Sequence, residues 1–292
     1  MDKQKLIGAL FVLLGAISYG ILATLVKYAN NLGIPISALT FFQYAIGFVI
    51  LLIINSFSRP LQIVSPLSKL KLSVWGISLG LTTTLYYLSI QYIPVSVGII
   101  LLMQSIWMSF VLEAALNRVM PTLKKSLGAM LCILGTLLAS KIFNTQFQLD
   151  WSGILLGIGA GTAYTISIYA SSSVEKQHSN YVRSLYLVTG GLILVTLFWN
   201  FKIIEHVSIP SFYWGTALAL FGTIIPPLLF TFGVPKIGMG TGSVISSVEI
   251  PVSILSACIL LQENVSLIQS IGVFLILLSV LIVNLNWSSK SA

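Results

Sequence analysis

The sequence predicts an all-α polytopic membrane protein with ten transmembrane helices, arranged as two inverted five-helix repeats. Three observations predict this fold: the composition, the spacing of the apolar segments, and a weak internal repeat. Of the 292 residues, 57% are hydrophobic and only 8% are charged, whereas a soluble domain has about 25% charged residues. So few polar groups cannot cover a globule in water, and the chain therefore needs lipid around it.

Apolar segments separated by polar, proline or glycine residues predict the helices, because a helix needs about 20 apolar residues to cross the hydrocarbon core. The first segment follows Met1 to Lys5 in the manner of a signal peptide, but it continues to about Val26 and no A-x-A-like cleavage site follows it. We interpret it as a retained helix. The ten predicted spans are 6–28, 36–56, 70–91, 95–116, 123–140, 152–173, 182–200, 211–232, 240–260 and 267–286.

The basic residues predict the orientation of these spans, because Lys and Arg collect in cytoplasmic loops. With the N-terminus in the cytoplasm, only Lys27, Lys141 and Lys202 lie outside. The net charge of +8 is then explained by topology rather than by nucleic-acid binding, and both termini are expected in the cytoplasm of a cell with a bacterial-type inner membrane. The twelve basic residues expected inside are Lys3, Lys5, Arg59, Lys69, Lys71, Arg118, Lys124, Lys125, Lys176, Arg183, Lys236 and Lys290.

Sequence matches about 140 to 145 residues apart indicate an internal repeat, with expected halves 1–142 and 150–288. Five spans in each half would invert the second copy in the membrane, and such repeats are typical of secondary transporters. A duplication kept only for packing is the alternative. The matches are Gly8 to Tyr19 (GALFVLLGAISY) with Gly153 to Tyr164 (GILLGIGAGTAY), Trp75-Gly76 with Trp214-Gly215, and Gly128 with Gly272.

The loop charges agree with inversion. The connection between the fourth and fifth spans carries Arg118, Lys124 and Lys125. Its counterpart between the ninth and tenth spans carries Glu263 and no basic residue. Because basic loops face the cytoplasm, equivalent loops of the two halves are expected on opposite sides of the membrane.

Several motifs resemble the drug/metabolite transporter superfamily in its EamA branch, and the resemblance covers nearly the whole chain. Glu249-Ile250-Pro251 resembles the family's E-x-P segment, and Leu260-Leu261-Gln262-Glu263 resembles its closing L-G-E, with Gln262 in place of the usual Gly. The first half departs from the pattern, with Gln104-Ser105-Ile106 near where an E-x-P would stand. The links IQYIPVSVG (90–98) and PKIG (235–238) also resemble the family. The resemblance implies two inverted bundles around a central cavity with alternating access.

Glu249 is the clearest functional candidate, because an ionisable group inside a bilayer costs several kcal/mol. It lies near the middle of the ninth span, one turn from Ser246 and next to Pro251, whose missing N–H frees a backbone carbonyl. The carboxylate could bind a cationic or amino group, or take up a proton. Alternatively, Ser243, Ser246 or a tyrosine satisfies it while it joins two helices.

Polar aromatic and amide side chains within the spans are the second signal. A buried tyrosine hydroxyl needs a partner, which a cavity or a neighbouring helix could provide. Tyr19 and Tyr164 occupy equivalent places in the two repeats, and Gln104, Trp107 and Glu249 are expected in one central site. The complete set of expected substrate-binding residues is Glu249, Gln104, Trp107, Tyr19, Tyr164, Tyr86, Gln43 and Ser246.

Other residues are candidates for a gate or a rim. Lys27 could anchor the first span at the interface or contact an anion from within. Glu113 and Arg183 are interpreted as rim charges, with a gate salt bridge as the alternative. Pro226 and Pro227 must interrupt the helix of the eighth span, for gating or for shape. Cys132 and Cys258 are expected to be buried packing thiols rather than a disulfide or a metal site.

The sequence argues against an enzyme. It has no HExxH motif, its histidines His178 and His206 lie in loops, and no second intramembrane carboxylate accompanies Glu249. Gly238 to Gly242 lack the Lys-Ser/Thr of a nucleotide-binding loop. We therefore expect no cofactor and no metal, and a secondary transporter that exports an amino acid or other amine-bearing metabolite, with protons as a candidate coupling ion. The alternatives are a membrane scaffold or sensor, and an importer of a larger metabolite. The expected partners are a small-molecule substrate and the lipid bilayer, with no nucleic acid and no signal for an oligomeric state.

Overall fold

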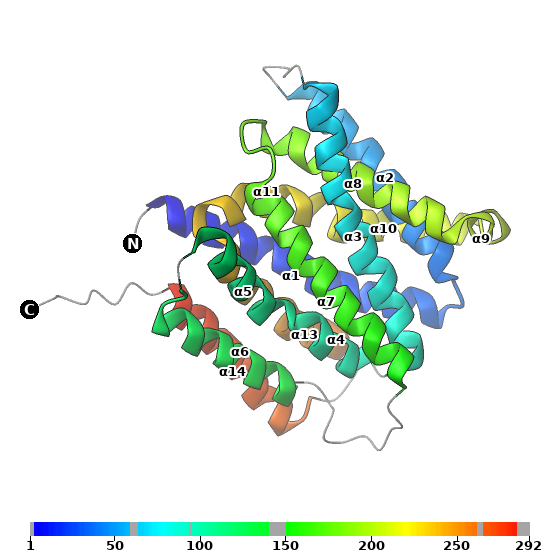
Figure 1. Cartoon of the computed structure of the whole chain (residues 1–292). Coiled ribbons are helices and arrows are strands. Elements are labelled where there is room, and N and C mark those ends of the chain that lie inside the picture. Colours follow the sequence, from blue (N-terminus) through cyan, green and yellow to red (C-terminus); the bar gives the residue numbers. More distant parts are fainter. Residues whose placement is uncertain are drawn as a thin grey trace, which may run out of the picture.

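The computed structural model describes residues 3–58, 64–93, 95–118, 120–139, 150–261 and 265–284. Within these ranges all regular elements are helices (Figure 1). Arg59, Pro94, Lys141, Gln262, Glu263 and Lys290, which enter the sequence interpretation, lie outside them. The elements are α1 (Lys3–Asn31), α2 (Ile36–Phe57), α3 (Pro66–Tyr92), α4 (Val95–Met103), α5 (Ser105–Asn117), α6 (Leu123–Ala139), α7 (Trp151–Ser173), α8 (Asn180–Trp199), α9 (Phe201–Glu205), α10 (Ile209–Leu218), the π-helix η2 (Ala219–Ile224), α11 (Ile225–Ile237), α12 (Met239–Ser246), α13 (Glu249–Leu261) and α14 (Leu267–Asn284).

Helices occupy all ten predicted ranges, and seven helical segments in the described part are long and apolar enough to cross a membrane by length and composition. The predicted spans 70–91, 123–140 and 267–286 are not among the seven. The first of these, in α3, is long but rich in Ser, Thr and Tyr, while α6 and α14 are apolar and short. The chain is thus an all-helical membrane protein, and the ten-span topology stays a prediction.

The predicted ninth span is two helices, α12 and α13, that meet at Ser247 and Val248. Pro251 has no N–H to donate back to the carbonyl of Ser247. The Ile250 N–H donates to that carbonyl instead, over 3.0 Å and three residues. The serine hydroxyls of this segment also bond backbone carbonyls three residues back, as in Ser246 Oγ to Ser243 O at 2.8 Å. Such side chains compete with the helical ladder and favour a break.

The predicted eighth span contains the π-helix η2, which ends just before Pro226 and Pro227. The Ile225 N–H donates to the Leu220 carbonyl, five residues back. The next donor in this pattern would be Pro226, which has none, so the carbonyl of Phe221 needs another partner. The Ser18 hydroxyl of α1 donates to it at 2.8 Å. The double proline therefore creates a backbone acceptor that a neighbouring helix satisfies.

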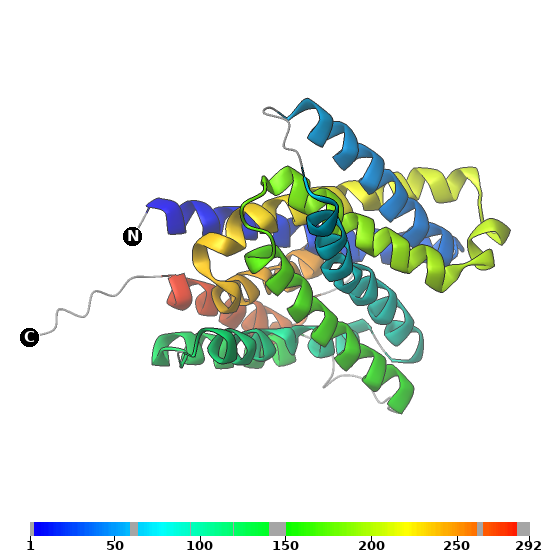
Figure 2. The same cartoon turned by 45° about the horizontal axis from the view of Figure 1, so that its top comes forward.

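Close helix packing holds the bundle together. Helix α3 packs against α7 and α8, α1 packs against α11 and α13, and α6 runs beside α14 (Figures 1 and 2). The α3–α8 contact requires glycine, because a Cβ at Gly76 would overlap the Leu187 carbonyl and one at Gly190 would overlap the Ser73 carbonyl. These approaches bring the backbones of distant segments into contact, as small residues do in membrane helices.

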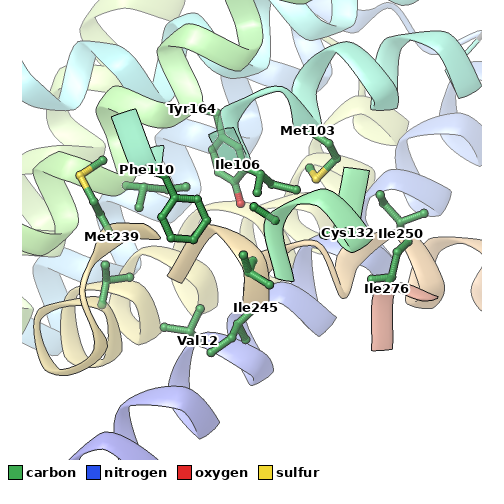
Figure 3. Packing of buried hydrophobic residues seen from close by; sticks show 14 of the residues in the cluster. Val12, Met103, Ile106, Phe110, Cys132, Tyr164, Met239, Ile245, Ile250 and Ile276 are labelled. Carbon is green, nitrogen blue, oxygen red and sulfur yellow. The ribbon is translucent and has the colours of Figure 1, made fainter. Parts of the chain in front are cut away.

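A cluster of buried hydrophobic residues surrounds α12, with members from α1, α5, α6, α7 and α14 (Figure 3). Cys132 belongs to this cluster, and its thiol donates to the Ser247 hydroxyl at the helix break over 2.9 Å. Cys258 is exposed on α13, so the expectation that it is buried is wrong. Cys258 lies about two and a half turns after the break between α12 and α13, on the outer face of the bundle.

Candidate functional site

A cavity lies between the break that separates α12 from α13 and the tyrosine-rich part of α3. It holds about 750 Å³ of empty space, including its open mouth. Helices α1, α2, α3, α4, α7 and α13 supply its lining. The described residues that line it are Tyr19, Leu22, Ala23, Tyr44, Leu79, Thr82, Thr83, Tyr86, Tyr87, Ile99, Leu102, Tyr164, Glu249, Ile250 and Ser253.

Among the described residues that line the cavity, Glu249 is the one with a charged side chain. It is the first residue of α13, so the break with α12 sets where its side chain leaves the backbone. The approach of α1 fixes that backbone further, because a Cβ at Gly20 would come within 2.7 Å of the Glu249 carbonyl oxygen. Among the described residues, no basic side chain forms an ion pair with the Glu249 carboxylate.

Three tyrosines share the cavity wall with this carboxylate. Tyr19, Tyr86 and Tyr164 lie close enough to Glu249 to interact with it electrostatically. The rings of Tyr19 and Tyr164 meet edge to face, with centroids 6.4 Å apart. The equivalent positions of these two tyrosines in the sequence repeat therefore coincide with a direct contact in space.

The tyrosine hydroxyls of the cavity differ in their hydrogen bonding. Tyr44 donates to the Leu79 carbonyl at 2.9 Å and lies 2.9 Å from the Thr83 hydroxyl. The buried hydroxyls of Tyr87 and Tyr164 have no hydrogen-bond partner in the described structure, although Ser246 lies near the Tyr164 hydroxyl. Buried polar groups left without partners are uncommon and indicate a place for water or a ligand.

Gln104 and Trp107 do not line this cavity, contrary to the expectation of one central site with Glu249. The Trp107 indole N–H donates to the Gln104 side-chain oxygen at 2.8 Å, and the Gln104 amide donates to the Ile100 carbonyl at 3.1 Å. Trp107 is 44% exposed. Gln104 directly precedes α5 and Trp107 lies in its first turn, so the spacing of three residues brings the two side chains together.

Gln43 and Ser246 are buried but also stand outside the described lining. Gln43 packs against Gly222 of the π-helix, and its side-chain oxygen has no partner. The Ser246 hydroxyl donates to the carbonyl of Ser243 within α12. The expected residues that the structure does bring together are Glu249, Tyr19, Tyr86 and Tyr164.

Comparison with known proteins identifies the chain. Residues 6–141 and again residues 151–285 match the EamA-like transporter family. The chain belongs to this family. An uncharacterized transporter of Archaeoglobus fulgidus is 25% identical over 278 residues, which cover 94% of this chain and 95% of that protein. A crystal structure with 16% sequence identity has the same fold, with a TM-score of 0.77 over 97% of this chain and 98% of that one.

Family membership fixes the broad function. The EamA-like chain is an integral membrane transporter of the drug/metabolite type with a small-molecule substrate, and it is not an enzyme. The resemblance deduced from Glu249-Ile250-Pro251 and the linking motifs is confirmed.

Sequence reasoning missed part of the lining in this EamA-like transporter. Thr82, Thr83 and Ser253 add hydroxyl groups that were not singled out, whereas Tyr44 and Tyr87 are intramembrane tyrosines for which the sequence left cavity lining and helix packing open. A detectable signal was the run of three threonines followed by two tyrosines in α3, which is unusually polar for an intramembrane helix. Ser253 lies one turn after Glu249, so helical spacing alone would have found it.

Arg183 is a buried structural residue of the transporter rather than a rim charge. Its side chain is 1% exposed at the start of α8, and the described structure gives it no carboxylate partner. The guanidinium donates to carbonyls at the end of α7, including Ser171 at 2.7 Å and Val174 at 2.9 Å, and to Thr231 of α11 at 3.3 Å. Five donors in a planar fork suit the unpaired carbonyls of a helix C-terminus.

Glu113 binds the N-terminal end of α12. The Gly240 N–H donates to the Glu113 carboxylate at 2.9 Å, and the Lys125 ammonium lies 3.7 Å away. Gly238, with φ of 84°, turns the chain into α12 directly beside the same carboxylate. A carboxylate is favourable there because the helix N-terminus carries partial positive charge. Glu113 also lines a second cleft with Asn117 and Lys176.

The remaining gate candidates lie apart from the cavity. Lys27 is half-buried near the end of α1 and is absent from the described lining. Pro226 and Pro227 are buried at the start of α11, and the Pro227 carbonyl accepts from the Ser184 hydroxyl at 3.0 Å. Both prolines therefore act on the shape of α11 at the contact with α8.

Proposed function

We propose that this protein is a secondary transporter that moves an amine-bearing small metabolite by alternating access around the central cavity. One observation carries the proposal: Glu249, a carboxylate without an ion-pair partner among the described residues, opens onto a cavity lined by five tyrosines. Holding a charge in such a place costs several kcal/mol, so a functional requirement is the expected reason for keeping it. Broken helices near the midplane are a frequent way to build transporter sites.

The proposed architecture is ten spans in two inverted halves, 1–142 and 150–288. Helix contacts support it, because a contact between a helix of one half and a helix of the other has a counterpart between the two equivalent helices. Helix α11 packs on α1 as α3 packs on α7, and α13 packs on α1 as α5 packs on α7. The breaks at Gln104 and at Ser247 are also separated by about the same distance in sequence as the repeated motifs. Equivalent contacts and breaks are expected of a duplicated fold.

The proposed orientation places both termini in the cytoplasm and the chain in an inner membrane, as the distribution of Lys and Arg favours. The cavity is lined by the C-terminal halves of α1 and α3, which would then lie toward the outside. At the opposite end, Lys71 of α3 and Glu175 after α7 form an ion pair of 2.9 Å, and Glu113 of α5 binds Gly240 of α12. These contacts join the two proposed halves, so opening toward the cytoplasm would have to release them.

The proposed direction is export, coupled to proton entry. A sequence without a nucleotide-hydrolysis motif leaves an ion gradient, exchange or simple facilitation, and we favour exchange. A single carboxylate can bind either a proton or an ammonium group, and alternate occupancy would exchange the two without net charge movement. Tyr19, Tyr86 and Tyr164 are the titratable groups that face it, and they stay neutral at physiological pH because the ordinary pKa of tyrosine is about 10.

The test is counterflow in proteoliposomes, with a labelled panel of amino acids, amines and organic cations. We expect uptake of one class by the wild type, and loss of that uptake by about a hundredfold in Glu249→Gln, which keeps the shape and removes the charge. Glu205→Gln is the matched control, because Glu205 is exposed on α9 and does not belong to the described cavity lining. Uptake that survives Glu249→Gln would make Glu249 structural, and no uptake of any compound would favour a membrane scaffold.

A further inference from the structure

The described lining of the cavity holds a full negative charge and no full positive charge. This lining holds one carboxylate, several hydroxyls and apolar side chains, and contains no Lys, Arg, His, Asn or Gln. We propose that the transported compounds are organic monocations, such as aromatic or alkyl amines, and that free amino acids are excluded by their own carboxylate. This inference rests on the proposed transport function and narrows its substrate class.

The ammonium group of such a compound fits at Glu249. Tyr19, Tyr86 and Tyr164 surround the carboxylate on the cavity side, and aromatic faces attract cations within about 6 Å. The unpartnered Tyr164 hydroxyl can accept a hydrogen bond from an N–H donor. A cation bound here would therefore supply the partners that Glu249 and Tyr164 lack.

The rest of the compound meets an apolar wall. Leu22, Leu79, Ile99 and Leu102 line the cavity together with the tyrosine rings. Such a wall binds a hydrocarbon or aromatic body through burial of its surface. The described lining thus has one charged end for an ammonium group and an apolar remainder for its substituent.

A substrate carboxylate finds no cationic partner in the described lining, where only hydroxyl groups could donate to it. In other transporters the N-terminus of a half-helix holds such a group, but here several N–H groups at the half-helix ends of the second half are already bonded. At α13 the N–H groups of Ile250 and Val252 donate to Ser247 and Val248, and Pro251 has no N–H. At α12 the Gly240 N–H is taken by Glu113. An amino acid carboxylate would enter without a cationic partner and beside the like charge of Glu249, and both effects weaken binding.

The experiment uses pairs of compounds that differ only by a carboxylate: phenethylamine with phenylalanine, and tyramine with tyrosine. Binding to the purified full chain is measured by ligand-induced thermal stabilisation, and transport by counterflow in proteoliposomes. We expect each amine to bind about a hundredfold more tightly than its amino acid, which is the scale of an unpartnered buried charge. Phenylalaninamide, which keeps the ammonium group and the bulk but lacks the negative charge, should bind like the amine.

Variants of Glu249 give a second readout. Glu249→Gln should lose amine binding, Glu249→Asp should retain part of it, and Glu205→Gln should leave it unchanged. If phenylalanine or tyrosine binds and counterflows as well as its amine, the transport function stands and the exclusion of amino acids is wrong. If neither member of either pair binds or counterflows, both the substrate class and the amine-transport function are wrong. Amine binding that Glu249→Gln leaves intact would overturn the assignment of the ammonium group to Glu249.

Discussion

Two regions of the molecule hold buried polar and charged groups in opposite ways. At the central cavity, Glu249 has no ion-pair partner among the described residues, and the hydroxyls of Tyr87 and Tyr164 have no hydrogen-bond partner. At the α7–α8 end, which we define by Glu113, Glu175 and Arg183 with their partners, each of these three charges is bonded. Both regions lie in one helical bundle and both contain carboxylates, so the difference comes from which groups lie near each charge and not from the types of residue present.

This difference separates structure from function. A buried charge with several partners stabilises the helices that supply them, and removing it leaves those partners unsatisfied. A charge without partners adds nothing to stability in the empty protein and is available to a ligand. Substitutions at the α7–α8 end should therefore change stability first, and substitutions at the cavity should change transport first.

The largest expected effect on stability is that of Arg183→Leu. This change removes five hydrogen bonds, including those to the carbonyls of Ser171, Val174 and Thr231, so we expect a loss of about 3 to 5 kcal/mol, because each buried acceptor left unsatisfied costs about 1 to 3 kcal/mol. Glu249→Gln should by contrast leave stability unchanged or raise it slightly. Thermal unfolding of both variants in detergent measures the two changes in stability. Equal destabilisation by the two substitutions would remove the distinction between the regions.

The next largest effect is that of Glu113→Ala. The substitution removes a charged acceptor from the Gly240 N–H at the start of α12, and hydrogen bonds to charged groups contribute about 1.5 to 3 kcal/mol. Lys125 is the other partner of Glu113, at 3.7 Å and partly exposed. Lys125→Met should therefore cost much less than Glu113→Ala in the same unfolding measurement. A cost that is the same for both would assign the effect to the ion pair and not to the helix end.

Two tyrosines of the cavity itself allow a finer comparison. Tyr44→Phe removes a hydroxyl that bonds Leu79 and Thr83, so we expect a loss of about 1 kcal/mol in stability. Tyr164→Phe removes an unpartnered hydroxyl and should not lower stability, but it should weaken amine binding severalfold. Unfolding and ligand-binding measurements on both variants test this. Destabilisation by Tyr164→Phe comparable to that by Tyr44→Phe would indicate a structural partner for the Tyr164 hydroxyl.

The sequence predicted where helices lie more accurately than what their polar residues contact. Long apolar segments locate a membrane helix by length alone, which is why helices occupy all ten predicted ranges. The π-helix before Pro226 and the break at Ser247 depend on which backbone carbonyls find other donors, such as Ser18 for Phe221. Those donors come from distant segments, and a single sequence does not pair them.

The same reasoning explains which site residues were foreseen. Glu249 was found because a carboxylate in an apolar run is costly wherever it points. Arg183 was misread because its partners are backbone carbonyls of α7 and α11, which no residue type reveals. Gln104 and Trp107 were misplaced because their repeat position suggested the cavity, whereas their spacing of three residues lets them bond each other. The mutual bond was visible in the sequence, and it outweighs the analogy between the halves.

The smallest expected effect concerns Glu175, which lies in the loop after α7. The hydrogen bond from Lys71 holds the pKa of the Glu175 carboxyl below its ordinary value. A carboxyl whose pKa is lowered by folding stabilises the folded state above its unfolded pKa, about 4.3, and loses that contribution as the pH falls through its folded pKa. The ion pair should therefore contribute at neutral pH and vanish in acid.

Lys71→Met isolates this contribution, because methionine keeps much of the apolar stem and removes the charge. Lys71 is 54% exposed and screened by solvent, so the cost at pH 7 should be about 1 kcal/mol or less. At pH 3 the wild type and the variant should unfold at nearly the same temperature. His178, 3.7 Å from Glu175, is present in both proteins and cancels in the difference. A cost that is equal at both pH values would show that Lys71 acts through packing, and the tie between α3 and the α7–α8 end would then not be electrostatic.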